Sequence, residues 1–359
     1  MGRLVMNEMF TKSKTTELPR IIMVGHGVIN DIGNVCKRLL LEKQALIVSD
    51  VNTKKIAGDK VEQILTDIGF DVHQTQINDA NQENIKKIKN QITELKINFV
   101  LGVGGGRPID VAKCASFECN LPFLSVPTAA SHDGIVSSRA SINVDGKRKS
   151  LTAQTPLAVV ADTHIIVSSP YRLLAAGCGD IVANITAVMD WKLAKRLKNE
   201  EFSSSASMLA DFTGRLMLEN SDMIKPGIEE SAWYVAKALV SSGVAMSIAG
   251  SSRPASGAEH KFSHALDEIA EKPALHGEQC GVGAIMMMYL HGGEWNKIRE
   301  ALLNIGAPTT AKRLGVSDDE MIRALTYAHK INPQRYTILG DNGLSYEAAE
   351  NLARITKVI

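Results

Sequence analysis

The chain has 359 residues, of which 45% are hydrophobic and 22% are charged, and its formal net charge at pH 7 is +1. This length fits two domains, each with its own core. The small net charge and the 5% aromatic content give no reason to expect nucleic acid as a partner.

Other features of composition point to a cytoplasmic protein. The cysteines are scattered and odd in number, which is a poor disulfide framework and fits a reducing compartment. The polar residues 1–17 are expected to lie at the surface, and we expect neither a signal peptide nor stable membrane insertion. The cysteines are Cys36, Cys114, Cys119, Cys178 and Cys280.

The first half of the chain alternates short apolar runs with amphipathic stretches. This alternation predicts a mostly parallel sheet covered by helices. Residues 138–151 differ, because Ile142 and Val144 alternate before a turn at Asp145-Gly146 and a basic run to Lys149 follows, which predicts a β-hairpin. The predicted strands are 21–24, 45–49, 71–74, 99–103, 123–126 and 159–161, and the predicted helices between them include 32–41, 54–68 and 84–95.

Beyond about Tyr171 the strand pattern stops and long helical patterns follow. Ser168-Ser169-Pro170 precedes the change and is typical of a helix start. We therefore predict an α/β domain at 1–170 and an all-helical domain at 171–359. The predicted helices are 172–198, 204–222, 228–250, 256–270, 278–291, 294–304, 318–329 and 345–357.

A glycine-rich turn follows the predicted strand 99–103. Gly104-Gly105-Gly106 leads into a helical stretch, and a helix N-terminus with exposed amides favours a pyrophosphate. The spacing GxGGGxxxD departs from the usual GxGxxG, so a tight turn without a ligand is the alternative. Asp110 could cap or orient this loop.

Two further segments could border a nucleotide. Asp50 ends a predicted strand, where an acid either binds an adenosine ribose hydroxyl or caps the next helix. The small, polar segment 127–137, with Thr128, Ser131 and Ser137, could line a cofactor groove or form a plain loop.

One carboxylate and several imidazoles form a candidate metal site. Asp180 lies in a Gly-Cys-Gly-Asp segment, His260 and His264 share one helical face, and His276 follows a turn. Imidazole nitrogen with carboxylate oxygen suits Zn²⁺, Fe²⁺ or Ni²⁺ better than Mg²⁺. The alternative is that the histidine pair at helical spacing only forms a solvated or hydrogen-bonded face.

Four motifs together resemble the archaeal sn-glycerol-1-phosphate dehydrogenases. This family groups with glycerol dehydrogenases, iron-containing alcohol dehydrogenases and 3-dehydroquinate synthases. The resemblance covers about residues 20–355. The motifs are Gly104-Gly105-Gly106-Arg107-Pro108-Ile109-Asp110-Val111-Ala112-Lys113, Pro127-Thr128-Ala129-Ala130-Ser131-His132-Asp133-Gly134, Cys178-Gly179-Asp180 and His276-Gly277-Glu278-Gln279-Cys280-Gly281-Val282-Gly283.

The resemblance implies a dehydroquinate synthase-like fold, an α/β nucleotide-binding domain followed by an all-α domain, with the active site between them. It implies that Asp180, His260 and His276 bind one Zn²⁺, and that Asp133, Asp180 and His264 contact substrate and take part in catalysis. The expected cofactor contacts, with the strand-end Asp50 added, are Gly106, Arg107, Pro108, Ile109, Asp110, Thr128, Ala129, Ala130, Ser131 and Ser137.

The implied activity is the NAD(P)H-dependent, zinc-assisted reduction of dihydroxyacetone phosphate to sn-glycerol 1-phosphate, which begins the archaeal phospholipid backbone. His264, or a water relayed by Asp133, would deliver the proton. Asp50 favours NAD over NADP without settling the choice. A homo-oligomer is expected. The candidate cations for the substrate phosphate are Lys147, Arg148, Lys149, Lys237 and Arg253.

Three alternatives stay open at this point. A glycerol dehydrogenase would use the same metal ligands on an unphosphorylated polyol. A cyclase similar to 3-dehydroquinate synthase would use NAD⁺ without net turnover. A nucleotide sensor would keep the fold without catalysis.

Overall fold

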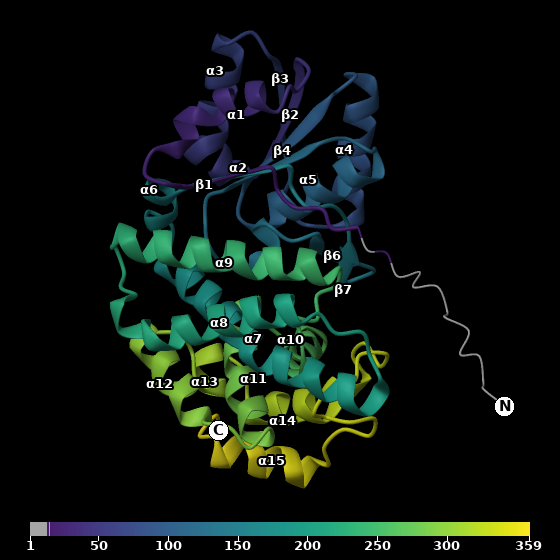
Figure 1. Ribbon diagram of the computed structural model, residues 1–359, viewed down its shortest axis with the longest axis vertical. Coiled ribbons are helices and arrows are strands. Elements are labelled where there is room, and N and C mark those ends of the chain that lie inside the picture. Colours follow the sequence, from purple (N-terminus) through teal and green to yellow (C-terminus); the bar gives the residue numbers. More distant parts are fainter. Residues whose placement is uncertain (1–12, 14) are drawn as a thin grey trace, which may run out of the picture.

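An α/β part and a helical part follow one another along the chain in the computed structural model, which describes residue 13 and residues 15–359 (Figure 1). The expectation for residues 1–17 falls mostly outside the described residues. The last strand ends at Asp162 and the first long helix begins at Tyr171. A domain boundary after residue 170 is compatible with this change and stays a prediction.

A six-stranded parallel sheet forms the centre of the first part, and all six predicted strands are confirmed. The strand order is β1-β8-β5-β4-β2-β3. The inner strands are buried on both faces, as their continuous apolar runs require. The bounds are β1 Ile21–Gly25, β2 Gln44–Ser49, β3 Asp71–Gln76, β4 Phe99–Gly104, β5 Phe123–Pro127 and β8 Ala158–Asp162.

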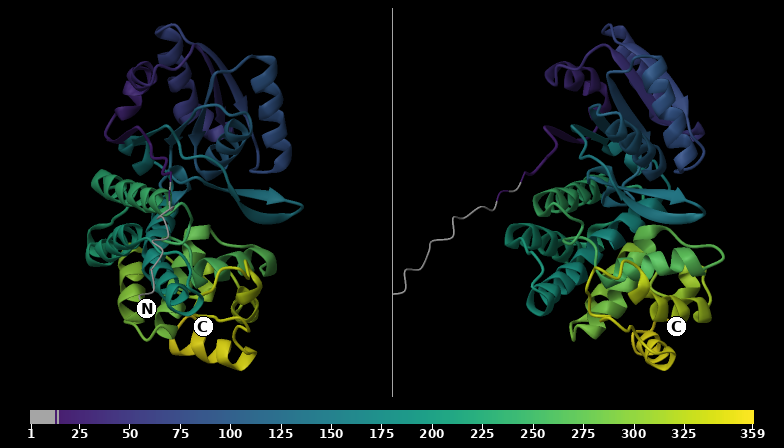
Figure 2. Two further views of the ribbon diagram at one scale, coloured as in Figure 1. Left: turned by 45° about the vertical axis from the view of Figure 1, so that its right-hand side comes forward. Right: turned by 90° about the vertical axis from the view of Figure 1, so that its right-hand side faces the viewer.

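Helices cover both faces of this sheet (Figure 2). One apolar cluster joins α1 and α3 to one face, and the larger cluster joins α4 and α5 to the other. The predicted helix 54–68 contains a π-helical turn. The elements are η1 Val28–Asp31, α1 Ile32–Arg38, α2 Val51–Thr53, η2 Lys54–Gly58, α3 Asp59–Asp67, α4 Gln82–Glu94 and α5 Gly106–Glu118.

The predicted hairpin is confirmed as β6 (Arg139–Val144) paired with β7 (Lys147–Thr152). Asp145 and Gly146 have φ of 54° and 78°, the positive values that a tight two-residue hairpin turn requires. The short helix η3 (Asp133–Ile135) precedes the hairpin. Figure 2 shows the hairpin extending away from the larger sheet, beside the junction with the helical part.

The second part is helical throughout its described residues, as predicted. By length and composition alone, α7 and α9 could cross a membrane, but 89% and 61% of their apolar windows are buried inside the protein, as expected of core helices. The short helix α6 Thr163–Val167 precedes the boundary and belongs to the first part. The helices of the second part are α7 Tyr171–Lys198, α8 Ser204–Glu219, η4 Ser221–Met223, α9 Glu229–Ala249, α10 Ala258–Ile269, α11 His276–Leu290, α12 Trp295–Ile305, α13 Ala311–Leu314, α14 Asp318–Tyr327, η5 Ala328–Lys330 and α15 Tyr346–Ile355.

Candidate functional site

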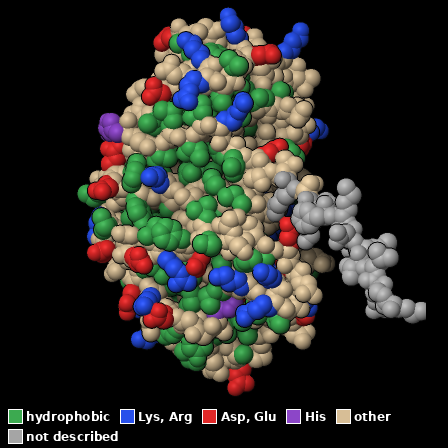
Figure 3. All heavy atoms as spheres, viewed as in Figure 1, with side chains coloured by type: hydrophobic (Ala, Val, Ile, Leu, Met, Phe, Trp, Pro, Cys, Tyr) green, Lys and Arg blue, Asp and Glu red, His purple; other side chains and the backbone are tan. Residues whose placement is uncertain are grey.

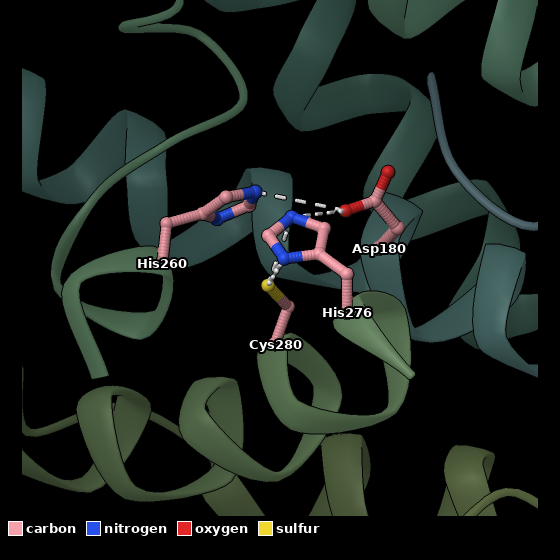
Figure 4. Close-up of side chains that lie close together, drawn as sticks. All are labelled: Asp180, His260, His276 and Cys280. Atoms are coloured by element: carbon pink, nitrogen blue, oxygen red, sulfur yellow. Dashed lines mark hydrogen bonds and ion pairs between the residues drawn. The ribbon is translucent and has the colours of Figure 1, made fainter. Parts of the chain in front are cut away.

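Four potential metal ligands from three helices converge (Figure 4). Asp180 comes from α7, His260 from α10, and His276 and Cys280 from α11, and their ligand atoms all lie within 4.8 Å of one another. Asp180 Oδ1 lies 3.6 Å from His260 Nε2 and 3.8 Å from His276 Nε2. The three residues predicted from the sequence as ligands are therefore brought together.

Hydrogen bonds behind these side chains orient them. His260 Nδ1 lies 3.0 Å from the buried Glu259 carboxylate, and His276 Nδ1 lies 3.1 Å from Ser263 Oγ. Each contact leaves the Nε2 atom of that imidazole free for the centre of the cluster. Asp180 Oδ2 accepts a hydrogen bond from the Asp133 amide at 3.0 Å.

Asp180 Oδ1 is buried and accepts no hydrogen bond from any described residue. A buried carboxylate oxygen without a donor is costly unless a cation completes its shell. One carboxylate oxygen and two imidazole nitrogens thus fit a divalent transition metal and leave a coordination position open.

Burial keeps two members of the cluster, His276 and Cys280, neutral. It lowers the pKa of His276 to about 3, with the nearby His260 adding to the effect, so His276 is a neutral imidazole able to bind metal. Burial also raises the pKa of the Cys280 thiol to about 11. Cys280 was not predicted as a site residue, although it lies one helical turn after His276 on α11.

Close glycine packing brings Asp180 and His276 together. A Cβ on Gly277 would lie 2.0 Å from the Ala176 carbonyl oxygen, and a Cβ on Gly179 would lie 2.3 Å from the Gly277 carbonyl oxygen. Only glycine allows α7 and the start of α11 to approach this closely. The helix contact therefore sets the position of two of the predicted ligands.

Asp133 lies where the α/β part meets the helices. Its amide binds Asp180, and its Oδ2 accepts a hydrogen bond from Ser242 on α9 at 2.9 Å. Asn184 of α7 donates to the same hydroxyl at 3.1 Å. Burial, reinforced by the charge of Asp180, raises the pKa of Asp133 to about 7. This carboxyl can therefore bind or release a proton near neutral pH.

His264 lies beside the cluster but outside it. Its ring centroid is 5.6 Å from that of His276, and its Nδ1 is 3.5 Å from Asp267 Oδ2. The position is compatible with a substrate contact, which stays a prediction.

The glycine turn leads from β4 into α5. Gly105 is the N-cap of α5, and a Cβ there would meet nothing within 4 Å. A Cβ on Gly106 would instead lie 2.2 Å from His132 Nε2. The Thr128 amide donates to the Gly104 carbonyl at 2.9 Å, so this turn and the segment after β5 lie side by side.

Asp50 caps α2. Its Oδ1 accepts hydrogen bonds from the Asn52 and Thr53 amides at 2.9 Å and 2.8 Å. Of the two alternatives from the sequence, the structure thus shows capping, and a ribose contact stays a prediction.

Asp110 points away from the glycine turn. Its Oδ2 accepts a hydrogen bond from the Ser141 amide at 3.0 Å, and its Oδ1 lies 3.6 Å from the buried Lys113 ammonium. Its contacts join α5 to the hairpin.

The remaining predicted cofactor residues lie around the turn with differing exposure. Arg107 is exposed, and its guanidinium donates to the Asn78 carbonyl at 3.2 Å. Ser131 is half-buried, and its cofactor contact stays a prediction like those of the others. The buried members are Pro108, Ile109, Thr128, Ala129, Ala130 and Ser137.

Three candidate phosphate ligands already have partners. Arg253 is buried against Glu200 and also donates to the Tyr336 carbonyl at 2.9 Å. Lys147 pairs with Glu268 at 3.0 Å, and the Lys237 ammonium lies 4.2 Å from the centroid of the Trp233 ring.

Sequence reasoning missed a different cation, Arg335. Its guanidinium donates to the Ser256 carbonyl at 2.6 Å and to Ser252 Oγ at 2.7 Å. Ser256 lies just before α10, the helix that carries His260. No local pattern around Arg335 could have predicted this contact.

Comparisons with known proteins agree with this geometry. The family model for iron-containing alcohol dehydrogenase matches residues 23–170. The glycerol-1-phosphate dehydrogenase (NAD(P)+) of Methanosarcina barkeri is 58% identical over 347 residues, which cover 97% of this chain and 97% of the relative. The enzyme of the same name from Methanothermobacter thermautotrophicus is 55% identical, with 96% and 98% covered.

Solved structures support the fold. Glycerol dehydrogenase from Schizosaccharomyces pombe superposes with a TM-score of 0.79 at 20% identity, covering 96% of this chain and 91% of that one. A probable glycerol dehydrogenase from Sinorhizobium meliloti 1021 gives 0.78 at 18% identity, with 97% and 100% covered.

Proposed function

The chain belongs to the NAD(P)-dependent glycerol-1-phosphate dehydrogenases, and from this premise we propose that Asp180, His260 and His276 hold the catalytic metal as Zn²⁺. The observation that supports this most directly is the buried Asp180 Oδ1, which faces both imidazole Nε2 atoms and has no donor among the described residues.

The reaction needs a polarised ketone, a hydride and a proton. When bound, Zn²⁺ supplies Lewis-acid polarisation of the ketone of dihydroxyacetone phosphate. Asp133 supports the proton step, because its pKa near 7 gives it a protonated fraction at neutral pH and Ser242 holds its carboxylate in place. His264, one turn beyond His260, is the second candidate donor. The product, sn-glycerol 1-phosphate, would enter phospholipid backbone synthesis.

We place the cofactor pyrophosphate at the start of α5. The open space beside Gly105 and the helix N-terminus that begins at Gly106 support this placement. Asp50 and the segment 128–137 would then border the nucleoside and the nicotinamide.

Gly105→Val is expected to raise the KM for the cofactor at least tenfold, because its side chain would fill the space assigned to the pyrophosphate (a loss of about 1.4 kcal/mol or more). Metal content should stay unchanged. The measurement is steady-state kinetics with elemental analysis. An unchanged cofactor KM in folded protein would place the pyrophosphate elsewhere. Gly106→Val is a less clean test, because it would also displace His132.

For the substrate phosphate, we propose Arg335 together with Arg139. Neither guanidinium pairs with a carboxylate among the described residues, and both have a lowered pKa because of burial. The pKa of Arg335 falls to about 10, with Arg253 and Arg139 as further causes. Arg139 shares one face of the hairpin with Ser150 and donates to its carbonyl at 2.7 Å. Half-buried guanidinium groups without a carboxylate hydrogen-bonded to them favour a dianion.

Arg335→Met is expected to raise the KM for dihydroxyacetone phosphate at least about tenfold and to reduce its dependence on salt, because a fixed charge for the phosphate is lost. Arg335→Lys should recover part of the loss. Arg354→Met, which removes an exposed arginine on α15, is the matched control. If the cofactor KM rose instead, Arg335 would belong to the cofactor site.

The activity is tested by steady-state assays with dihydroxyacetone phosphate and dihydroxyacetone, with NADH and with NADPH, and by chiral analysis of the product. We expect the phosphorylated ketone to be much the better substrate, because the phosphate positions the carbonyl. Equal turnover of dihydroxyacetone would favour a glycerol dehydrogenase. Product formation without net cofactor oxidation would favour a cyclase.

Exposed apolar side chains support a homo-oligomer. Figure 3 shows apolar side chains over the face where α8 and α9 run. Met208 and Phe212 of α8 are 71% and 60% exposed, and Trp233 of α9 is 39% exposed. A patch of this kind is typical of an association surface. Light scattering of the purified protein would test it.

All five cysteines are free thiols. This supports the proposal that the protein works in a reducing cytoplasm.

A further inference from the structure

A second group of ligand-type side chains lies away from Asp180 and its neighbours. His26, His164 and Glu229 offer ligand atoms that lie within 4.8 Å of one another. His26 Nδ1 is 3.0 Å and 3.1 Å from the two Glu229 carboxylate oxygens, and the two imidazole centroids are 5.2 Å apart. The catalytic role proposed above uses none of these residues.

The backbone around both histidines is held by one buried carboxylate. Asp162 Oδ1 accepts hydrogen bonds from the Gly27 amide at 3.2 Å and from the His164 amide at 3.1 Å, and its Oδ2 accepts one from the Ile29 amide at 3.1 Å. Asp162 ends β8, and its neighbour β1 ends just before His26. The two imidazoles therefore follow directly after the ends of two neighbouring strands, His26 after β1 and His164 at the start of α6 after β8.

Glu229 comes from the helical part, at the first turn of α9. Thr163 Oγ1 donates to its Oε1 at 2.5 Å. This hydrogen bond and that of His26 hold the pKa of Glu229 below its usual value, so the side chain is an anion at neutral pH. Its position is fixed by contacts with the same segments that carry the histidines.

We propose that His26, His164 and Glu229 form a second, peripheral binding site for a divalent transition metal such as Zn²⁺. Two imidazole nitrogens and one carboxylate oxygen are a common zinc donor set, and the His26 side chain, 73% exposed, leaves room for water as the fourth ligand. The filled site joins the ends of β1 and β8 to α9, so it links the α/β part to the helical part. It is more exposed than the Asp180 site and binds metal more weakly.

The test is equilibrium dialysis of metal-free protein against Zn²⁺, with elemental analysis. Wild-type protein is expected to take up two equivalents, and His164→Ala one. His73→Ala, which removes another partly exposed histidine of the α/β part, is the matched control and should keep two. His164→Ala should also keep its dehydrogenase activity, because His164 has no part in the reaction.

A second measurement separates this site from the proposed catalytic one. In Asp180→Asn, one equivalent should remain and zinc should still raise the thermal midpoint, because a ligand that binds only the folded state stabilises it. Adding His164→Ala to Asp180→Asn is expected to abolish both the remaining zinc equivalent and the rise in the thermal midpoint. If that double variant misfolds, Glu229→Gln replaces His164→Ala in the same test. Uptake of a single equivalent that wild-type protein shows and Asp180→Asn loses, or an unchanged second equivalent in His164→Ala, would overturn the proposal.

Discussion

Asp180→Asn should lose the bound metal and reduce kcat about a thousandfold or more. The amide keeps the size of the side chain but removes the negative charge from the atom that faces both imidazole Nε2 atoms. Lewis-acid polarisation of a carbonyl contributes several kcal/mol to the barrier, and its loss corresponds to a factor of this size. Elemental analysis and steady-state kinetics on the same preparation give the two readouts.

Four further variants test whether the loss of metal and rate is specific to the proposed ligands. Asp211→Asn, on α8 where the half-buried carboxylate pairs with Arg215 away from the cluster, should change neither readout. His260→Ala and His276→Ala should behave like Asp180→Asn. His264→Ala should keep its metal and lose rate or substrate affinity, because its ring lies outside the four-residue cluster. Full metal content and full rate in Asp180→Asn would refute the assignment of this ligand.

Gly277→Ala should destabilise the protein and empty the metal site. Replacing a helical glycine by alanine is ordinarily stabilising by about 1 kcal/mol. Here the new methyl group would lie 2.0 Å from the Ala176 carbonyl oxygen, so α11 must shift away from α7. Such overpacking costs about 1–3 kcal/mol. His276 precedes the substituted residue and would move with it, away from Asp180.

Thermal unfolding and elemental analysis would measure the effect. Gly25→Ala is the control, because its nearest contact would be Val28 at an ordinary 3.4 Å. A Gly277→Ala variant with unchanged thermal midpoint and metal content would show that the two helices can separate without cost.

The fold could be predicted because its evidence is repeated many times along the chain. Strand–helix alternation predicted the parallel sheet, and Asp145-Gly146 predicted the hairpin turn. The π-helical turn in 54–68 was not predicted, because it occupies the start of the segment, Lys54–Gly58, and leaves too few residues before it to show a shift in the apolar pattern.

The site was predictable where a role depends on residue type and local spacing. Helical spacing placed His260 and His264 on one face, and Cys280 could have been added, since it follows His276 at helical spacing. The set of Asp180, His260 and His276 came from the family resemblance, because these residues lie far apart along the chain; the structure brings them together. The role of Asp110 could not be predicted from residue type and local spacing. Its partner, the Ser141 amide, lies on the hairpin and comes close only because the hairpin packs on α5. The same holds for Arg335, whose contact with Ser256 joins segments far apart in the chain.

The glycine contact between α7 and α11 also has a consequence for the order in which folding and metal binding occur. Asp180 and His276 belong to α7 and α11, and α8, α9 and α10 lie between them along the chain. A chain that has formed its helices but not yet docked them holds these two ligands apart, and closing so long a loop is slow compared with helix formation. If Asp180 and His276 hold the metal as proposed, high-affinity metal binding belongs to the last stage of folding. On that proposal, a newly made chain remains metal-free, and inactive, until α7 and α11 have docked.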